Sequence, residues 1–339
     1  MVRLKPHNRK VAAKINKILK GLVSASPISL ILFAFSHQVN ADSSPLPTAV
    51  IQSRDLLGNT ASAIGIGLDS LFSTPNKNQT NQSTLILRSG FFWDDTSEAS
   101  FVNSISFRAD LPSTAEKFQL YIRAQREDNI GINEETTVHE DDDSTDLIER
   151  KIKGGEAGLF FRMIRQVPDT AWQNTFDTGV TADGVDLEFI SYLRVSRIYQ
   201  VNQWQVQPEP NVFWSPSNGL AAGLSLHSKF QFDSETTLQN STNIHHYFDS
   251  QKNYYSHGWQ LAKQLSPDLR ATYNIRFYSN SDSDETVETF KISASLRRRI
   301  YGNWLFFNVT PADRHTASEN YERDLSITFQ FEAKFGSKY

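Results

Sequence analysis

The chain has 339 residues, of which 39% are hydrophobic and 12% aromatic, and its formal net charge is −4. It contains no cysteine, which excludes disulfides, a thiol nucleophile and a cysteine-bound zinc centre. A bundle of membrane helices is also excluded, because each span needs about 20 apolar residues and no such run follows the N-terminal region. A soluble globular protein and a membrane β-barrel remain, since a barrel uses only alternate residues for its lipid face.

Residues 1–41 are typical of a signal peptide. They contain seven basic residues and no acidic one, then an apolar run from Gly21 to Phe35 and the small-residue cleavage site Val39-Asn40-Ala41. An uncleaved anchor is the alternative, but the apolar run is shorter than a membrane span. Loss of the seven positive charges lowers the net charge from −4 to −11, so we expect an exported, acidic protein without a nucleic-acid partner.

Residues 42–82 are predicted to form a periplasmic tether followed by one short amphipathic helix. The tether is the Ser/Pro-rich segment 42–49, and residues 76–82 are rich in Asn and Gln, which indicates a loop. Glycines weaken the helix, but apolar residues recur between them at helical spacing. These apolar residues are Val50, Leu57, Ala61, Ile64, Leu68, Leu71 and Phe72.

From residue 83 to the end, apolar and polar residues alternate, which predicts β-strands with one apolar face. The segments run roughly 10 to 13 residues, the length of a tilted membrane strand, whereas soluble strands average about 5 to 6. We therefore predict an all-β, antiparallel, up-and-down transmembrane β-barrel over residues 83–339, with a soluble secreted β-protein as an alternative. The fourteen predicted segments are 83–93, 99–110, 116–126, 155–165, 171–181, 185–198, 203–214, 219–231, 235–247, 253–264, 268–278, 287–300, 303–310 and 323–336.

The lengths of the connections support this topology. The long gaps 127–154, 279–286 and 311–322 all follow odd-numbered segments, and the shortest links follow even-numbered ones. With the N-terminus in the periplasm, long loops lie outside the cell and tight turns inside, as in outer-membrane barrels. Twelve strands remain an alternative, because 171–181 and 235–247 alternate poorly. Aromatic residues expected at the membrane interfaces are Trp93, Trp214, Tyr199, Tyr301, Trp304 and Tyr339.

Four short stretches carry a resemblance to a family. They are Leu68-Asp69-Ser70-Leu71-Phe72, Arg108-Ala109-Asp110-Leu111-Pro112, Trp304-Leu305-Phe306-Phe307 with Pro311, and Phe331-Glu332-Ala333-Lys334-Phe335-Gly336. With them the chain resembles proteobacterial (Gram-negative) outer-membrane proteins without assigned function, although it continues to Tyr339 where such proteins are expected to stop near the Phe-Gly. The resemblance implies a barrel in the outer membrane, in contact with its lipids, whose C-terminal strand is recognised by the barrel assembly machinery. It implies no activity.

The polar faces of the segments are rich in arginine. If the apolar faces point to lipid, the lumen is basic, and few acidic residues share its faces, namely Asp110, Asp186, Glu188 and Glu332. One interpretation is an arginine-lined pore that attracts small anionic solutes. The other is an interior plugged by salt bridges. The candidate lumen-facing residues are Arg88, Arg108, Arg123, Arg162, Arg194, Arg270, Arg276, Arg297 and Arg299, with lysines Lys229, Lys291 and Lys334 beside them.

The acidic residues gather elsewhere. The segment from Glu127 to Glu149 holds ten acidic residues and no basic one. It is predicted to be a solvated loop, and the alternative is a surface site for divalent cations.

Catalytic patterns are weak. Ser225 and His227 share one face of a predicted strand, which suggests a lipid-modifying hydrolase as an alternative function. His245 and His246 point to opposite faces and do not predict a metal site. We find no phosphate-binding glycine loop or nucleophile elbow, so no catalytic residue, metal or cofactor is predicted. The favoured function is a narrow or gated pore, or a structural barrel.

Overall fold

The computed structural model describes residues 83–95, 99–111, 117–127, 157–167, 171–183, 186–283 and 285–336. The predicted signal peptide, tether and amphipathic helix lie outside these residues, as does most of the acidic segment 127–149. Within the described residues, no helix is both long and apolar enough to cross a membrane.

The described residues form fifteen strands and one short 3-10 helix, η1 (Ala317–Glu319). The strands are β1 (Thr84–Asp94), β2 (Ser100–Leu111), β3 (Lys117–Glu127), β4 (Ala157–Gln166), β5 (Trp172–Asp183), β6 (Asp186–Arg197), β7 (Tyr199–Val201), β8 (Trp204–Ser215), β9 (Gly219–Gln231), β10 (Thr236–Tyr247), β11 (Lys252–Ser266), β12 (Leu269–Asn280), β13 (Thr289–Tyr301), β14 (Leu305–Thr316) and β15 (Asp324–Gly336).

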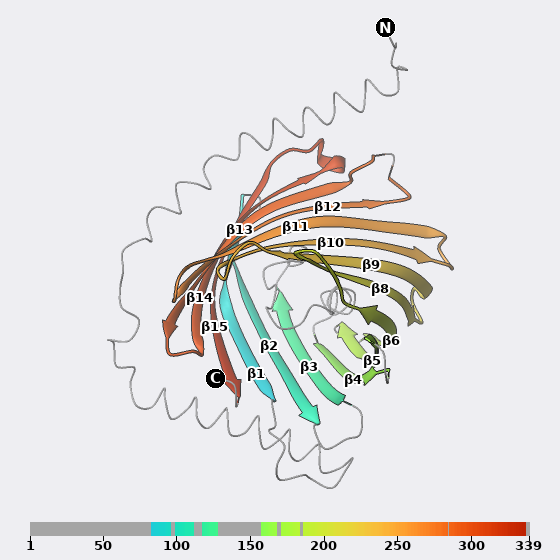
Figure 1. Ribbon diagram of the computed structural model, residues 1–339. Helices are drawn as coiled ribbons and strands as arrows, with labels where there is room; N and C mark the ends of the chain where they lie inside the picture. The colour runs from blue at the N-terminus through green and yellow to red at the C-terminus, as the bar shows by residue number, and fades with distance from the viewer. Residues whose placement is uncertain are drawn as a thin grey trace. The chain divides into compact units, whose positions relative to one another are not determined.

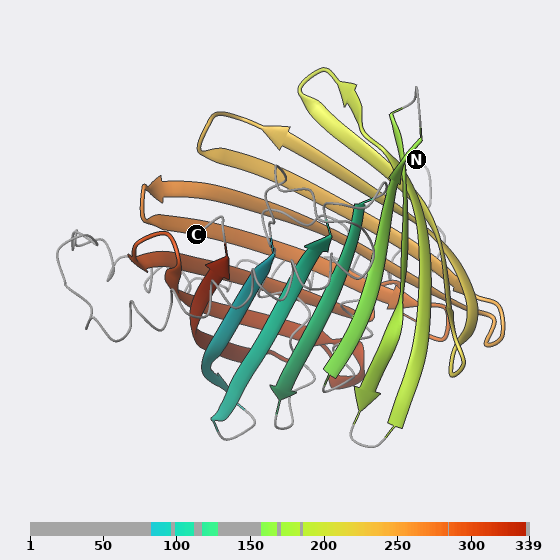
Figure 2. The same ribbon diagram turned by 90° about the horizontal axis from the view of Figure 1, so that it is seen from below.

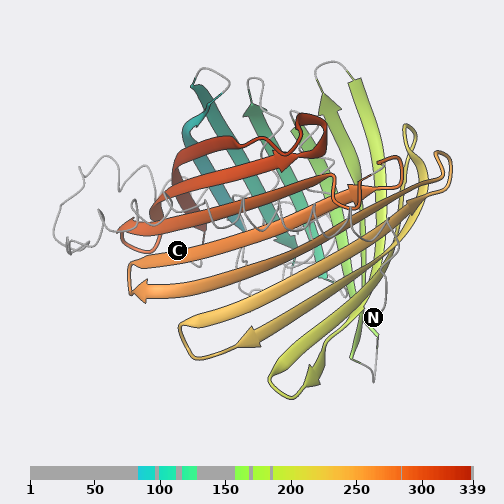
Figure 3. The ribbon, with the colours of Figure 1, turned by 90° about the horizontal axis from the view of Figure 1, so that it is seen from above.

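These strands form a closed antiparallel barrel. Strands that are adjacent in sequence pair with each other, and the first strand β1 pairs with the last strand β15 from Thr84↔Gly336 to Asp94↔Ser326. The three-residue β7 continues β6 along the edge of β8, so the wall has fourteen strand positions. Figure 1 shows the strands around one interior, and the views from below and above have opposite walls in front (Figures 2 and 3).

The predicted strand positions are confirmed to within a few residues at most ends. The segments 171–181 and 235–247 form β5 and β10, so the alternative of twelve strands is wrong. The prediction missed β7. It also ended the thirteenth segment at residue 310, whereas β14 continues to Thr316.

The error in β14 has a physical cause. Proline has no N–H, and Pro311 was therefore placed in a loop. The carbonyl of Trp304 accepts a hydrogen bond from β15, so even-numbered residues of β14 face β15 and the odd-numbered Pro311 faces β13. The pairing of β13 with β14 indeed passes from Ser293↔Ala312 to Leu296↔Val309 without the intervening pairs. The strand survives because its pairing with β15 does not need this N–H.

The outer face of the barrel is apolar. Residues of thirteen strands, β1 to β12 and β15, place large hydrophobic side chains on it, each at least about one third exposed. No other element of the described chain covers these side chains, and hydrocarbon is the solvent in which such a surface is stable. Examples are Phe91, Trp93, Phe101, Ile105, Ile122, Leu159, Val180, Phe189, Leu193, Val212, Leu224, Ile244, Trp259, Leu261, Tyr273, Phe329 and Phe331.

The expected aromatic residues at the strand ends follow two patterns. Trp93, Trp214 and Tyr199 are exposed on the outer face, as aromatic side chains at a membrane interface are. Trp304 differs, because it is buried against Phe335 with ring centroids 6.0 Å apart. Tyr339 lies outside the described residues.

Candidate functional site in the barrel interior

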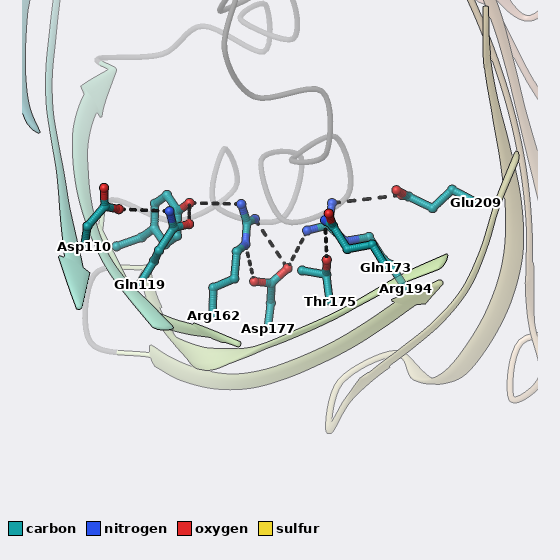
Figure 4. A network of polar contacts seen from close by, with 9 residues as sticks. Asp110, Gln119, Arg162, Gln173, Thr175, Asp177, Arg194 and Glu209 are labelled. Atoms are coloured by element: carbon teal, nitrogen blue, oxygen red, sulfur yellow. Dashed lines mark hydrogen bonds and ion pairs between the residues drawn. The ribbon is translucent and has the colours of Figure 1, made fainter. Parts of the chain in front are cut away.

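The nine predicted basic residues occupy one face of the sheet. The strand register places them on the face that also carries Asp177 and Glu209. Figure 4 shows that the side chains of Asp177 and Glu209 point into the interior. For Arg123 only the backbone position is described, opposite Ser106 and Gly158. The inner-face positions are Arg88, Arg108, Arg123, Arg162, Arg194, Arg270, Arg276, Arg297 and Arg299.

One group of these residues forms a charge-balanced cluster, here called the neutral network: Arg162, Asp177, Arg194 and Glu209. The Nε of Arg162 donates to Oδ1 of Asp177 at 2.5 Å, and Nη2 of Arg194 donates to Oδ2 of Asp177 at 2.9 Å. Nη1 of Arg194 lies 3.9 Å from Oε1 of Glu209. The four residues come from β4, β5, β6 and β8, and each is no more than 4% exposed.

The neutral network continues into β3 and β2. Nη1 of Arg162 donates to the hydroxyl of Tyr121 at 3.0 Å, and its guanidinium carbon lies 4.6 Å from the Tyr121 ring centroid. Tyr121 in turn donates to Gln119, whose amide donates to Oδ1 of Asp110 at 2.9 Å. Figure 4 shows this chain of contacts along the inner side of the barrel wall. It joins six strands through side chains and so stiffens this part of the wall.

A second group, here called the basic wall, lies on the inner faces of β12 to β15 and β1. It contains eight basic residues against three acidic ones, so most of its positive charge is not balanced on the wall itself. Its basic residues are Arg88, Arg270, Arg276, Lys291, Arg297, Arg299, Arg314 and Lys334, and its acidic residues are Asp94, Asp324 and Glu332.

Like charges stand side by side on the basic wall. Arg276 is directly opposite Lys291, which is directly opposite Arg314 on the next strand. Arg270 is likewise opposite Arg297. Directly opposed like charges destabilise a sheet. An anion between them would relieve the repulsion.

Two carboxylates of the basic wall, Glu332 and Asp324, bind arginines. Glu332 accepts from Nε of Arg88 at 2.8 Å and from Nη2 of Arg297 at 2.6 Å. Asp324 accepts from Nε of Arg314 at 2.8 Å. Outside the wall, Asp268 in the β11–β12 turn accepts from Nε of Arg299 at 2.7 Å. These contacts fix the arginine side chains without cancelling the total charge.

Sequence reasoning placed Glu332 of the basic wall in the lumen, but it missed Asp94 and Asp324 of that wall and Asp177 and Glu209 of the neutral network. Asp177 lies in the segment 171–181, where the inner face consists mainly of small Thr and Gly residues and the alternation is hard to see. Glu209 stands between Pro208 and Pro210 in the predicted segment 203–214, and it was not included among the lumen-facing acidic residues. Tracing the register from the neighbouring strands would have placed Asp177 opposite Arg162.

The residues considered for catalysis or metal binding lie on β9 and β10. Ser225 and His227 share the inner face of β9, and the hydroxyl of Ser225 accepts from Nδ2 of Asn211 at 3.5 Å. His245 is buried on the inner face, whereas His246 lies on the opposite face of β10 with Nδ1 2.9 Å from Oδ1 of Asn253. No group of three metal-ligating side chains is found among the described residues.

A closed antiparallel barrel with an apolar outer face and a polar, charged inner face defines an outer-membrane β-barrel protein. No known family model matches the chain, and no curated protein matches its sequence. Among solved structures, the chain is similar to the outer membrane channel DcaP of Acinetobacter baumannii, with 10% identity and a TM-score of 0.48, over 78% of this chain and 99% of that chain.

Two further solved structures are similar. One is OccK10 (OpdN) of Pseudomonas aeruginosa, with 12% identity and a TM-score of 0.44, over 76% of this chain and 99% of that chain. The other is OmpT, an outer membrane protein of Vibrio cholerae, as a loop deletion mutant, with 6% identity and a TM-score of 0.46 over 76% and 99%.

Proposed function

We propose that this outer-membrane barrel is a narrow or gated pore that prefers small anions. The observation that carries the proposal is the basic wall, where eight basic side chains stand against three acidic ones on the inner faces of β12 to β15 and β1. The other side of the interior contributes the neutral network, which adds no net charge. Among the described residues, the basic wall is therefore an electropositive surface of the interior.

This arrangement gives anion preference by two physical effects. Positive side chains beside low-dielectric walls concentrate the electric field and raise the local anion concentration. Guanidinium groups also pair bidentately with carboxylate and phosphate, so the arginines favour solutes that carry those groups. The row Arg276, Lys291 and Arg314 offers three successive positive charges to such a solute.

Planar-bilayer recordings with the purified full chain test the proposal. Under a KCl gradient, we expect the reversal potential to show Cl⁻ preference. The double variant Arg276→Gln with Lys291→Gln should reduce that preference while still folding, because it removes two opposed like charges. The matched control is Arg298→Gln, which removes one positive charge from the outer face of β13 beside Arg297. Preference for K⁺, or barrels that never conduct, would overturn the proposal.

We infer further partners from the same architecture. The apolar outer face contacts outer-membrane lipids. Strand β15, apolar at Phe329, Phe331 and Phe335, is proposed to be recognised by the barrel assembly machinery. The relation to proteobacterial outer-membrane proteins without assigned function, and the cleavage of residues 1–41, are likewise proposals. We assign no catalytic role to Ser225 or His227.

A further inference from the structure

The wall of the barrel has one weak seam, between β6 and β8. The two strands pair only from Ser191↔Trp214 to Arg194↔Asn211, and β7 then pairs with β8 from Tyr199↔Val206. Among the described strands, every other neighbouring pair around the wall is matched over eight or more residues. The register is the same on both sides of the gap, so the residues between have lost their pairing without any shift.

Two prolines account for the gap. The carbonyl of Leu220 accepts from the N–H of Phe248, so even-numbered residues of β9 face β10 and odd-numbered ones face β8. The odd-numbered residues of β8 therefore face β9, and Pro208 and Pro210 face β6. Proline has no N–H, so two consecutive donors of this ladder are missing. The pairing of β8 with β9 continues unbroken past both prolines.

The missing donors matter because of where they lie. By the constant register, Val195 is opposite Pro210 and Arg197 is opposite Pro208. Hydrocarbon offers no replacement hydrogen bonds, and an unpaired backbone group there is costly. The unpaired stretch, residues 195–198 against 207–210, is about 13 Å long at an ordinary rise per residue. Among the described strands, it is the stretch where two prolines remove consecutive donors from one ladder.

Unpaired polar atoms line the inner side of this stretch. Arg194 is 1% exposed, and its Nε and Nη1 have no hydrogen-bond partner. Asn211, its register partner across the seam, is 4% exposed, and its Oδ1 has none either. Nη2 of Arg194 is already bonded to Asp177. Nη1 has only an ion pair with Glu209 at 3.9 Å, longer than a hydrogen bond. Nε and Nη1 therefore each keep an N–H group for an anionic oxygen, since a buried guanidinium without hydrogen bonds is strongly disfavoured.

A second arginine stands on the outer side of the same stretch. Arg197 lies on the outer face, with its guanidinium carbon 4.9 Å from the Tyr199 ring centroid and 5.8 Å from that of Trp172. Its Nε also has no hydrogen-bond partner. Around it the outer surface is apolar, with Leu193 and Val212 both more than 40% exposed. Aromatic rings with arginine beside an apolar surface mark the depth of lipid headgroups.

We propose that residues 195–198 and 207–210 form a lateral portal for a single-chain amphiphile with an anionic headgroup. Arg197 receives the headgroup from the membrane interface, and Arg194 receives it on the inner side. The acyl chain passes between strands whose ladder lacks two donors. Arg197 and the neutral network beside the portal together contain three arginines and two carboxylates. One bound anion therefore balances their charge.

Photo-crosslinking tests the portal. The full chain is reconstituted in phosphatidylcholine vesicles with photoactivatable palmitate, photoactivatable lysophosphatidic acid or an uncharged photoactivatable alkyl maltoside. The two anionic probes distinguish a fatty carboxylate from a lipid phosphate. We expect the anionic probes to label peptides containing 193–198 and 207–212, and the maltoside to label the outer face evenly. Arg197→Gln should lower the anionic labelling by about tenfold, since it removes a charge-assisted hydrogen bond.

A disulfide across the seam between β6 and β8 provides a second test of the portal. The chain has no native cysteine, so Ile198→Cys with Gln207→Cys, opposite one another by the constant register, can be oxidised to bridge the gap and reduced to release it. Oxidation should abolish labelling of the inward-facing Ser196, and reduction should restore it. The matched control is Val206→Cys with Ser228→Cys, a register pair across the intact β8–β9 ladder.

The outcomes separate this proposal from the pore. Equal labelling by the maltoside, or labelling of Ser196 that persists in the oxidised variant, would overturn the portal. A second, non-crosslinked variant, Pro208→Val with Pro210→Val, restores both N–H groups and should also reduce labelling. Heat-modifiable migration on a gel reports that each variant has folded. The oxidised barrel should keep its conductance, so failure of the pore and failure of the portal are distinguishable.

Discussion

At the scale of single residues, Asp177 is the centre of the neutral network, because both of its oxygens are bonded to buried arginines. Its replacement by Asn removes the carboxylate charge that the buried Arg162 and Arg194 share. Removal of one partner of a buried ion pair costs about 3–5 kcal/mol. We therefore expect Asp177→Asn to unfold at clearly lower guanidinium concentration than the native chain in lipid vesicles, as followed by tryptophan fluorescence.

The matched control for this prediction is Asp110→Asn at the other end of the same chain of contacts. Asp110 is only half-buried, and an Asn in its place keeps an Oδ1 that can accept the hydrogen bond from Nε2 of Gln119. Its replacement should cost about 1 kcal/mol or less. If the two variants unfold together, the neutral network does not stabilise the barrel in the way described.

Asp233, in the β9–β10 turn, makes the stability of that turn depend on pH. The backbone N–H of Glu235, and then that of Thr236, donates to its carboxylate and lowers its pKa from the usual value of 3.8. A group whose folded-state pKa is lowered stabilises the fold above its unfolded-state pKa, and this contribution disappears as the pH falls through the folded-state value. The difference in unfolding midpoint between the native chain and Asp233→Ala should therefore be constant from pH 7 to about pH 5 and vanish in stronger acid. A difference that grows on acidification would contradict this account.

At the scale of elements, glycine sets how closely β1 approaches β15. A Cβ on Gly90 would lie 2.0 Å from the carbonyl oxygen of Phe329 and 2.8 Å from Cα of Gln330, both backbone atoms. Gly90→Ala should therefore destabilise the barrel by about 1–3 kcal/mol, the usual effect of overpacking. Guanidinium unfolding measures it.

Gly258→Ala on β11 is the comparison for that prediction. Its Cβ would meet Nε of Arg276 at 3.0 Å, the far end of a flexible side chain, and the carbonyl oxygen of Ile275 at 3.2 Å. We therefore expect Gly258→Ala to destabilise the barrel less than Gly90→Ala does. A larger loss at Gly258 than at Gly90 would show that β1 and β15 can separate without penalty.

The elements were the most predictable part of the molecule. Alternation located β9 at the same bounds that the structure shows, since one face of that strand meets lipid and the other does not. It failed at Pro311, where the predicted segment stopped and β14 continues, because which neighbour a proline faces depends on register, and register is not local information. The arginine positions of the interior follow from alternation alone. Their partners do not, because Asp177 and Glu209 meet Arg194 only after β5, β6 and β8 are aligned.

At the scale of the whole molecule, the charges are separated around the interior, with the basic wall on one side and the neutral network on the other. A preference that arises from this charge should weaken as salt screens it, because the Debye length falls from about 10 Å at 0.1 M to about 3 Å at 1 M. We expect the Cl⁻ preference measured in planar bilayers to decline over this range. A preference independent of salt would instead indicate selection by contact at a constriction.

The pairing of β1 with β15 also determines when the barrel can be completed. These strands are the first and last of the barrel, and their ladder runs the length of both. Every other strand meets a neighbour that is close in sequence, apart from β3 and β4 on either side of the long acidic segment. An N-terminal-first export pathway therefore delivers β1 with an open edge that nothing in the barrel can cover until residue 336 has crossed. During that interval the chain is an open sheet with two unpaired edges, and such edges favour self-association.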